Sequence, residues 1–136
     1  GSESTCPTGN MASFSVTESS RPDDRHVLNS RPLIEALLEG IRAGEPAGRL
    51  ALDFHVAVAR SSAHIASEIC AREGLDTVAL SGGVFMNRLL LQLLTRELKS
   101  AGLTVLVPRT VPVNDGCIAY GQAAVASARL AQIASQ

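Results

Sequence analysis

The chain has 136 residues, a formal net charge of −1 and 46% hydrophobic residues, which suits one domain with a real core. The lack of a basic excess and an aromatic content of 3% argue against nucleic-acid binding. No apolar run reaches the roughly 20 residues that a membrane-spanning helix needs. The three cysteines, Cys6, Cys70 and Cys117, are widely spaced. They predict neither a disulfide framework nor a zinc knuckle and fit a reducing cytoplasm.

The first 30 residues contain few large apolar side chains. Residues 1–11 look like an expression-vector remnant that ends in a start methionine. Residues 12–30 are rich in serine, aspartate, arginine and proline, which predicts a flexible lead-in. The folded part is therefore expected over residues 31–136.

Two helices are predicted next, because apolar residues recur at helical spacing. The first runs from Pro32 to Ala43, and the second, longer one runs from Ala47 to Glu73, between Pro46 and Gly74. The apolar stripe expected to bury the long helix repeats mostly every four residues and consists of Leu50, Phe54, Val58, Ile65 and Ile69.

After the long helix, the pattern changes to strand, helix, strand, helix. Strands are expected at Thr77–Ser81 and Leu103–Val107, a helix from Asn87 to Ala101 between them, and a last helix from Ile118 to about Ile133. Such a unit makes parallel strands joined by a right-handed crossover and covered by helices. Because two strands make a poor sheet, we expect the chain to be part of a larger α/β domain or to self-associate.

Two loops follow the carboxyl ends of these strands, where α/β sheets bind ligands. Gly82 and Gly83 follow the first strand, and Asn114, Asp115 and Gly116 lie beyond the second. Adjacent glycines let backbone N–H groups approach a phosphate, but they also suit a tight turn without a ligand. A carboxylate at position 115 suits a divalent metal, but taken alone an aspartate here more often caps a helix.

Other candidate residues have simpler interpretations. His55 and His64 are nine positions apart, which places them on opposite sides of a helix, so they do not share a metal ion. His55, beside Phe54, is expected to serve helix packing or hydrogen bonding. Cys70 is expected in the core, and Cys117 lacks a nearby histidine that would activate it as a nucleophile.

Two segments resemble a known family. The run from Val78 to Leu90, VALSGGVFMNRLL, is similar to the glycine loop of the hydrogenase-maturation carbamoyltransferase HypF family. The run from Val111 to Ala123, VPVNDGCIAYGQA, is similar to that family's C-terminal motif. The likeness extends over about residues 31–132. The wider superfamily includes tRNA threonylcarbamoyltransferases of the TsaD type and antibiotic O-carbamoyltransferases.

The resemblance implies a fold and a function. The chain would be the C-terminal lobe of an actin/sugar-kinase-like (ribonuclease H-like) α/β ATPase domain. It would act in an enzyme that uses ATP and carbamoyl phosphate, through carbamoyl-adenylate, to carbamoylate the C-terminal cysteine of a HypE-like partner. That group becomes cyanide on the iron of [NiFe] hydrogenase. The implied site residues are Gly82, Gly83, Asn87, Asn114 and Gly116 for the nucleotide, and Asp115 for a divalent metal, iron or zinc.

Departures from the family pattern limit what this chain does alone. The His-x-x-x-His pair of the family's metal site has no counterpart here, which argues against metal binding by this chain. Met86 stands where glutamine is common in the family, and Cys117 stands where the family usually has glycine. No catalytic residue is assigned, and the isolated chain is expected to lack turnover. The alternatives are a non-catalytic assembly or dimerisation module, which would form a homodimer, and the lobe of a tRNA threonylcarbamoyltransferase-like or O-carbamoyltransferase enzyme. The missing N-terminal lobe is the other expected partner.

Overall fold

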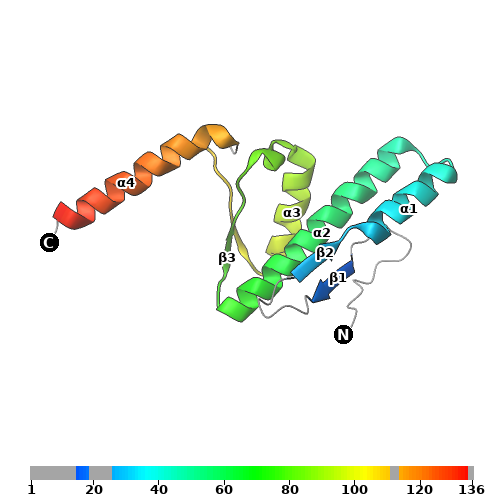
Figure 1. Cartoon of the computed structure of the whole chain (residues 1–136), viewed down its shortest axis with the longest axis horizontal. Helices are drawn as coiled ribbons and strands as arrows, with labels where there is room; N and C mark the ends of the chain where they lie inside the picture. Colours follow the sequence, from blue (N-terminus) through cyan, green and yellow to red (C-terminus); the bar gives the residue numbers. More distant parts are fainter. Residues whose placement is uncertain (1–14, 19–25, 111–113, 135–136) are drawn as a thin grey trace.

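A computed structural model describes residues 15–18, 26–110 and 114–134 (Figure 1). The vector remnant expected at residues 1–11 lies outside these ranges. The elements in chain order are β1 (Ser15–Glu18), β2 (His26–Asn29), α1 (Arg31–Arg42), α2 (Ala47–Glu73), β3 (Thr77–Ala79), the 3₁₀ helix η1 (Gly83–Met86), α3 (Arg88–Ser100), β4 (Thr104–Leu106), the 3₁₀ helix η2 (Asp115–Cys117) and α4 (Ile118–Ala134).

A short antiparallel hairpin precedes the helices. Strands β1 and β2 pair from Ser15 opposite Asn29 to Glu18 opposite His26, and they form a sheet separate from β3 and β4. The polar composition of this segment did not predict any strand. The helices and the later strands, in contrast, lie within one or two residues of their predicted positions.

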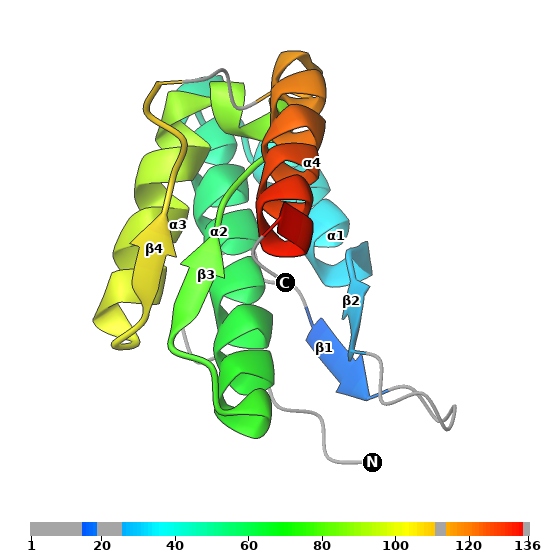
Figure 2. The same cartoon turned by 90° about the vertical axis from the view of Figure 1, so that its left-hand side faces the viewer.

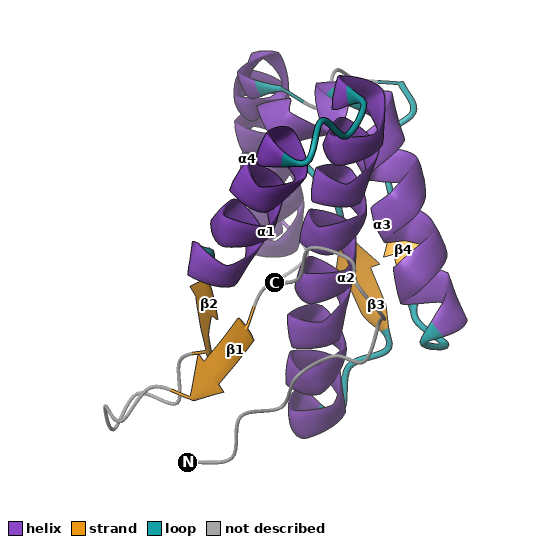
Figure 3. Ribbon diagram, turned by 90° about the vertical axis from the view of Figure 1, so that its right-hand side faces the viewer, coloured by secondary structure: helices purple, strands orange, loops and turns teal. Residues whose placement is uncertain are grey.

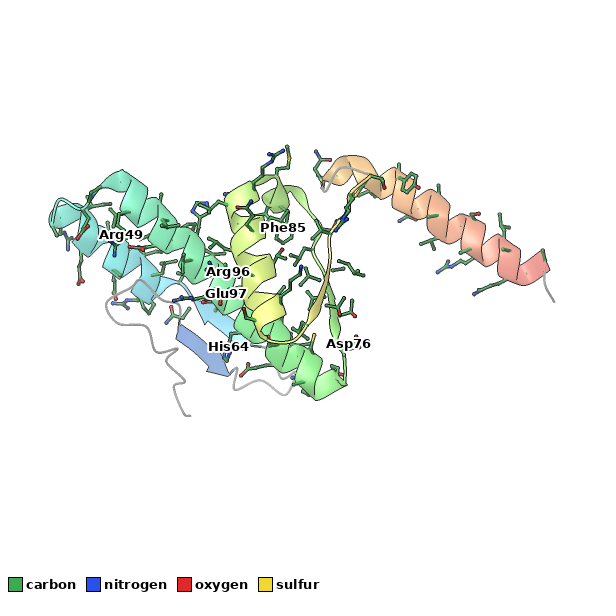
Figure 4. All side chains as sticks on the ribbon, turned by 180° about the vertical axis from the view of Figure 1, so that it is seen from behind. Arg49, His64, Asp76, Phe85, Arg96 and Glu97 are labelled. Carbon is green, nitrogen blue, oxygen red and sulfur yellow. The ribbon has the colours of Figure 1, made fainter. Side chains whose placement is uncertain are left out.

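Helices α2 and α3 form the centre of the molecule (Figure 3). The predicted stripe of α3 is confirmed, since Leu90, Leu94 and Leu98 are all buried. They pack with Ala59 and Ala63 of α2. An ion pair of 3.8 Å between Arg60 Nε and Glu97 Oε1 also joins the two helices, and Figure 4 labels Glu97 on α3. The core is therefore a leucine ridge on α3 packed against small residues of α2.

The predicted apolar stripe of α2 is confirmed only in part: Val58 packs against the core, but Phe54 and Ile69 do not. The buried residues of this helix are Ala57, Ala59, Ala63 and Cys70, whereas Phe54 is 42% exposed and Ile69 is 37% exposed. Alanines allow two helix backbones to approach closely, so the packed face of α2 is its small-residue face. The spacing of apolar residues predicted the helix correctly. It did not predict which face of α2 is buried by the other described elements.

Strands β3 and β4 are parallel, with Val78 paired to Val105, and their carboxyl ends point the same way (Figure 2). Val78 and Val105 face the helices and are half-buried, while Ala79 and Leu106 are exposed on the opposite face. Parallel sheets are normally covered on both faces. Within the described ranges, helices cover one face of this sheet and leave the other open.

Helix α4 extends away from the rest of the molecule (Figure 1). None of its residues is buried, and its large apolar side chains are 52–70% exposed: Ile118, Tyr120, Val125, Leu130 and Ile133. Arg129 is its only charged residue. A helix that is apolar all round is normally covered by other structure. None of the helices in the described ranges combines the length and apolar content of a membrane span.

Candidate functional site

The glycine loop starts directly after β3, where Leu80 is buried and its N–H donates to Leu106 O. Gly82 has φ 117° and ψ 157°, a conformation that only glycine adopts readily. The chain then turns into η1, in which Phe85 N donates to Gly82 O at 3.0 Å. Phe85 packs against the core beneath the loop (Figure 4). Gly82 is thus required by the backbone geometry.

Two backbone N–H groups of this loop are available to a ligand. The amides of Gly83 and Val84 precede the first hydrogen bond of η1, and no described residue accepts from them. Gly83 is exposed, and no described atom lies within 4 Å of the position where a Cβ would stand. An anion could therefore approach the backbone here without displacing a side chain.

Asn87 lies at the exit of the loop and begins α3. Its Oδ1 accepts a hydrogen bond from Leu90 N at 3.1 Å, which is a helix N-cap. Its Nδ2 donates to His55 Nε2 of α2 at 2.7 Å. Both ends of the Asn87 amide are therefore engaged within the protein, although the residue is exposed to solvent.

The second loop is organised by Asn114. Its Oδ1 accepts from Gly116 N at 3.1 Å, immediately before α4. A Cβ at Gly116 would stand 3.1 Å from the same oxygen, so glycine suits this tight turn. Residues 111–113, at the start of the motif, lie outside the described ranges. The N-cap of η2 is thus Asn114 and not Asp115.

The two loops meet. Asn114 Nδ2 donates to the thioether sulfur of Met86 at 3.7 Å, which joins the second loop to the end of η1. This agrees with the expectation that both loops lie at one edge of the sheet, and Figure 2 shows them at the same end. Nothing in the sequence around Met86 predicts this contact.

The residues that the structure describes do not form a metal site by themselves. Asp115 is exposed, and no other residue of the described ranges bonds to its carboxylate. No three histidine, cysteine, aspartate or glutamate side chains come together in the part of the chain that the structure describes. His64 lies within 3.4 Å of Glu68 on its own helix, consistent with separate roles for the two histidines. A metal held by Asp115 would need its other ligands from outside the described residues.

A groove of about 580 Å³ opens elsewhere, along α3. Its lining includes Leu91, Thr95, Arg96, Lys99 and Val107. Arg96 is within 3.4 Å of Glu97, its neighbour on α3 (Figure 4). None of the predicted nucleotide-binding residues lines this groove, so the groove and the two loops are separate features.

Comparison with known proteins decides the family. The family described as "Carbamoyltransferase, Kae1-like Domain, second subdomain" matches residues 4–122. The chain belongs to the HypF carbamoyltransferase family. The match includes residues 4–11, part of the segment expected to be a vector remnant. The resemblance stated from the two motifs is confirmed.

Curated HypF relatives are longer than this chain. A carbamoyltransferase HypF homolog from Cupriavidus necator is 42% identical over 108 residues, which are 77% of this chain and 27% of that protein. Carbamoyltransferase HypF from Rhizobium leguminosarum is 44% identical over 100 residues, 73% of this chain and 13% of that protein. The chain therefore spans about a quarter or less of these HypF relatives.

Solved HypF structures show the same fold. A crystal structure of full-length HypF in the phosphate- and nucleotide-bound form aligns with a TM-score of 0.79 and 29% identity, covering 92% of this chain and 16% of that one. The HypF of T. kodakarensis aligns with a TM-score of 0.67 and 30% identity, covering 77% of this chain and 14% of that one. The α/β fold class predicted from the sequence is confirmed.

Proposed function

We propose that this chain is the nucleotide-binding C-terminal lobe of a HypF-type carbamoyltransferase. The observation that carries the proposal is the junction of the two loops through Asn114 and Met86, beside the amino end of α3. The nucleotide named in the description of the full-length HypF structure supports a nucleotide in this family.

The chain's own groups would bind phosphate through the backbone. The N–H groups of Gly83 and Val84 point to no partner in the described ranges, and the first turn of α3 adds partial positive charge. Asn87 would act by shaping the loop, because its amide is already engaged at both ends. Asn114 and Gly116 would play the same shaping role in the second loop.

The reaction assigned to the complete enzyme follows from the family resemblance. ATP and carbamoyl phosphate would yield carbamoyl-adenylate, and the carbamoyl group would pass to the C-terminal cysteine of a HypE-like protein in hydrogenase maturation. The present chain contributes no group that we assign to that transfer. Its proposed share is to hold the nucleotide while the remainder of the enzyme supplies the acceptor site and the metal ligands.

An N-terminal lobe, which the family resemblance implies, is the proposed partner of the uncovered surfaces. Two apolar surfaces of the chain are of a kind that other structure normally covers. They are the open face of the β3–β4 sheet, where Leu106 is 55% exposed, and helix α4, which has no buried residue. Relatives several times longer than this chain contain the sequence that could supply this cover. The same surfaces also favour the second candidate function, a module that dimerises, because another copy could cover them instead.

An amide NMR titration of the chain with magnesium–ATP tests the proposal. We expect shifts confined to residues 82–87 and 114–116. Asp115→Ala should weaken them if its carboxylate faces the metal-bound phosphates, whereas Glu39→Ala, which removes an exposed carboxylate from α1, should not. Shifts centred on the groove near Lys99 would contradict the proposal. A concentration-dependent dimer with no ATP-induced shifts, measured by sedimentation, would favour the dimerisation module.

A further inference from the structure

The strongest unassigned feature is the contact that joins α2 to the end of the glycine loop. His55 lies in the N-terminal half of α2, and each of its two ring nitrogens makes a hydrogen bond. Nδ1 is 2.6 Å from Ala51 O, one helical turn earlier, and Nε2 is 2.7 Å from Asn87 Nδ2. These residues are 32 positions apart in sequence. The histidine therefore ties the loop exit to a different helix.

The direction of each hydrogen bond is fixed by backbone groups. Leu90 N can only donate, so the Asn87 oxygen must face it and the Asn87 NH₂ must face His55. Ala51 O can only accept, so the proton of the neutral imidazole is on Nδ1. His55 Nε2 is then an acceptor, as the Asn87 NH₂ requires. The four groups form one continuous chain of hydrogen bonds from α3 to α2.

We propose that His55 is a positioning residue, whose Nε2 acceptor holds Asn87 and thereby fixes the glycine loop for a nucleotide. Asn87 has φ −72° and ψ 99°, an extended conformation between η1 and α3. A free amide could cap α3 from several rotamers, but an amide bonded at both ends has one orientation. The loop conformation thus depends on an acceptor atom at position 55. The nucleotide part of this inference rests on the proposed function.

Two roles of the His55 side chain can be separated by substitution: accepting a hydrogen bond from Asn87 and packing its ring. The ring of His55 also makes an edge contact with Phe54, with centroids 5.8 Å apart. His55→Gln keeps a side-chain oxygen that can accept from Asn87, whereas His55→Phe keeps the ring volume and loses the acceptor. A residue that serves only packing would tolerate phenylalanine better than glutamine. A positioning residue shows the reverse order.

Amide hydrogen exchange of the free 136-residue chain provides the first test. In His55→Phe we expect exchange at the Phe85 and Leu90 amides to rise about three- to tenfold, the effect of one net hydrogen bond. His55→Gln should stay within about twofold of the unchanged chain. His64→Phe, on the same helix but paired with Glu68, is the matched control and should have no effect there. Unchanged exchange at Leu98 in the core shows that each variant is folded.

A double variant shows whether His55 acts through Asn87. Asn87→Ser keeps a hydroxyl cap for α3 but removes the NH₂ that bonds to His55. If the two residues form one unit, adding His55→Phe to Asn87→Ser should not raise exchange at Phe85 further. Additive increases, or a glutamine variant no better than phenylalanine, would overturn the proposal.

Magnesium–ATP binding separates this inference from the proposed function. We expect His55→Phe to weaken binding about three- to tenfold and His55→Gln to restore most of it. If the unchanged chain shows no binding while the exchange pattern holds, the proposed function fails and the positioning of the loop stands. If binding occurs but is equal in all His55 variants, the positioning role fails and the proposed function stands.

Discussion

Asn114 Nδ2 and Met86 Sδ lie 3.7 Å apart, and this contact is a hydrogen bond between two loops separated by 28 residues in sequence. Thioether sulfur is a weak acceptor, so the bond holds the second loop less firmly than an oxygen would. Met86 is also 66% exposed, which lets water compete for the Asn114 amide. The junction of the two loops is therefore adjustable by a single substitution.

Replacing the acceptor at position 86 should change the order of the second loop. Met86→Gln supplies a carbonyl oxygen, so we expect exchange at the Gly116 amide to slow by about two- to fivefold. Met86→Leu keeps a similar volume without an acceptor, so exchange there should quicken. Hydrogen exchange measured by NMR checks both changes. Equal exchange in the two variants would show that Asn114 does not depend on this contact.

Adjacent glycines in the first loop should respond differently to alanine. Gly82→Ala places a side chain at φ 117°, so we expect a loss of about 1–3 kcal/mol in the free energy of unfolding. Gly83→Ala meets no described atom within 4 Å and should change stability little. Its methyl group would instead obstruct a ligand at the Gly83 amide. Urea unfolding and magnesium–ATP titration of both variants measure the two effects, and equal stability losses would contradict this assignment.

Leucines in the core and on α4 should differ in their contribution to stability. Leu98 is 1% exposed, so Leu98→Ala should lower the free energy of unfolding by about 2–5 kcal/mol. Leu130 is 67% exposed, so Leu130→Ala should change it by less than about 0.5 kcal/mol. Urea unfolding of the two matched variants measures the difference. A large loss from Leu130→Ala would show that α4 packs on the body of the chain or on another copy.

Charge on α4 should affect association but not the fold of this chain. Ile133 is 70% exposed, so Ile133→Glu should leave the unfolding midpoint unchanged. If the N-terminal lobe covers α4, the same variant should no longer co-purify with that lobe when the two are produced together, because docking would bury a carboxylate. Glu39→Gln on α1 serves as the control. Retained co-purification would show that the lobe docks elsewhere.

The sequence predicted the parts of this structure that depend on local pattern. The stripe of Leu90, Leu94 and Leu98 identified a helix and its buried face, and Gly74, with φ 66°, ends α2 where expected. The two loops were placed at one sheet edge because a parallel crossover unit leaves no other arrangement. The hydrogen-bonding alternative for His55 was also correct.

Features that depend on distant partners were not predictable. The buried face of α2 is set by which helix packs on it, and its alanines give little signal in a hydrophobic periodicity. The bonds from Asn87 to His55 and from Asn114 to Met86 join residues about 30 positions apart. An asparagine can bond to many kinds of side chain, so the sequence does not indicate which residue is its partner. The assignment of Gly82, Gly83, Asn87, Asn114, Asp115 and Gly116 to ligand binding stays a prediction.

The exposure of α4 on all sides affects the free energy with which this chain binds a partner. Helices in proteins gain most of their stability from tertiary packing, and none of the 17 residues of α4 is buried. Gly121 in its interior weakens the helix further. In the isolated chain α4 should therefore interconvert between helix and coil, and its helicity should increase on docking. Part of the free energy of docking is then consumed in ordering the segment. The affinity of the complex would therefore be lower than its apolar contact area suggests.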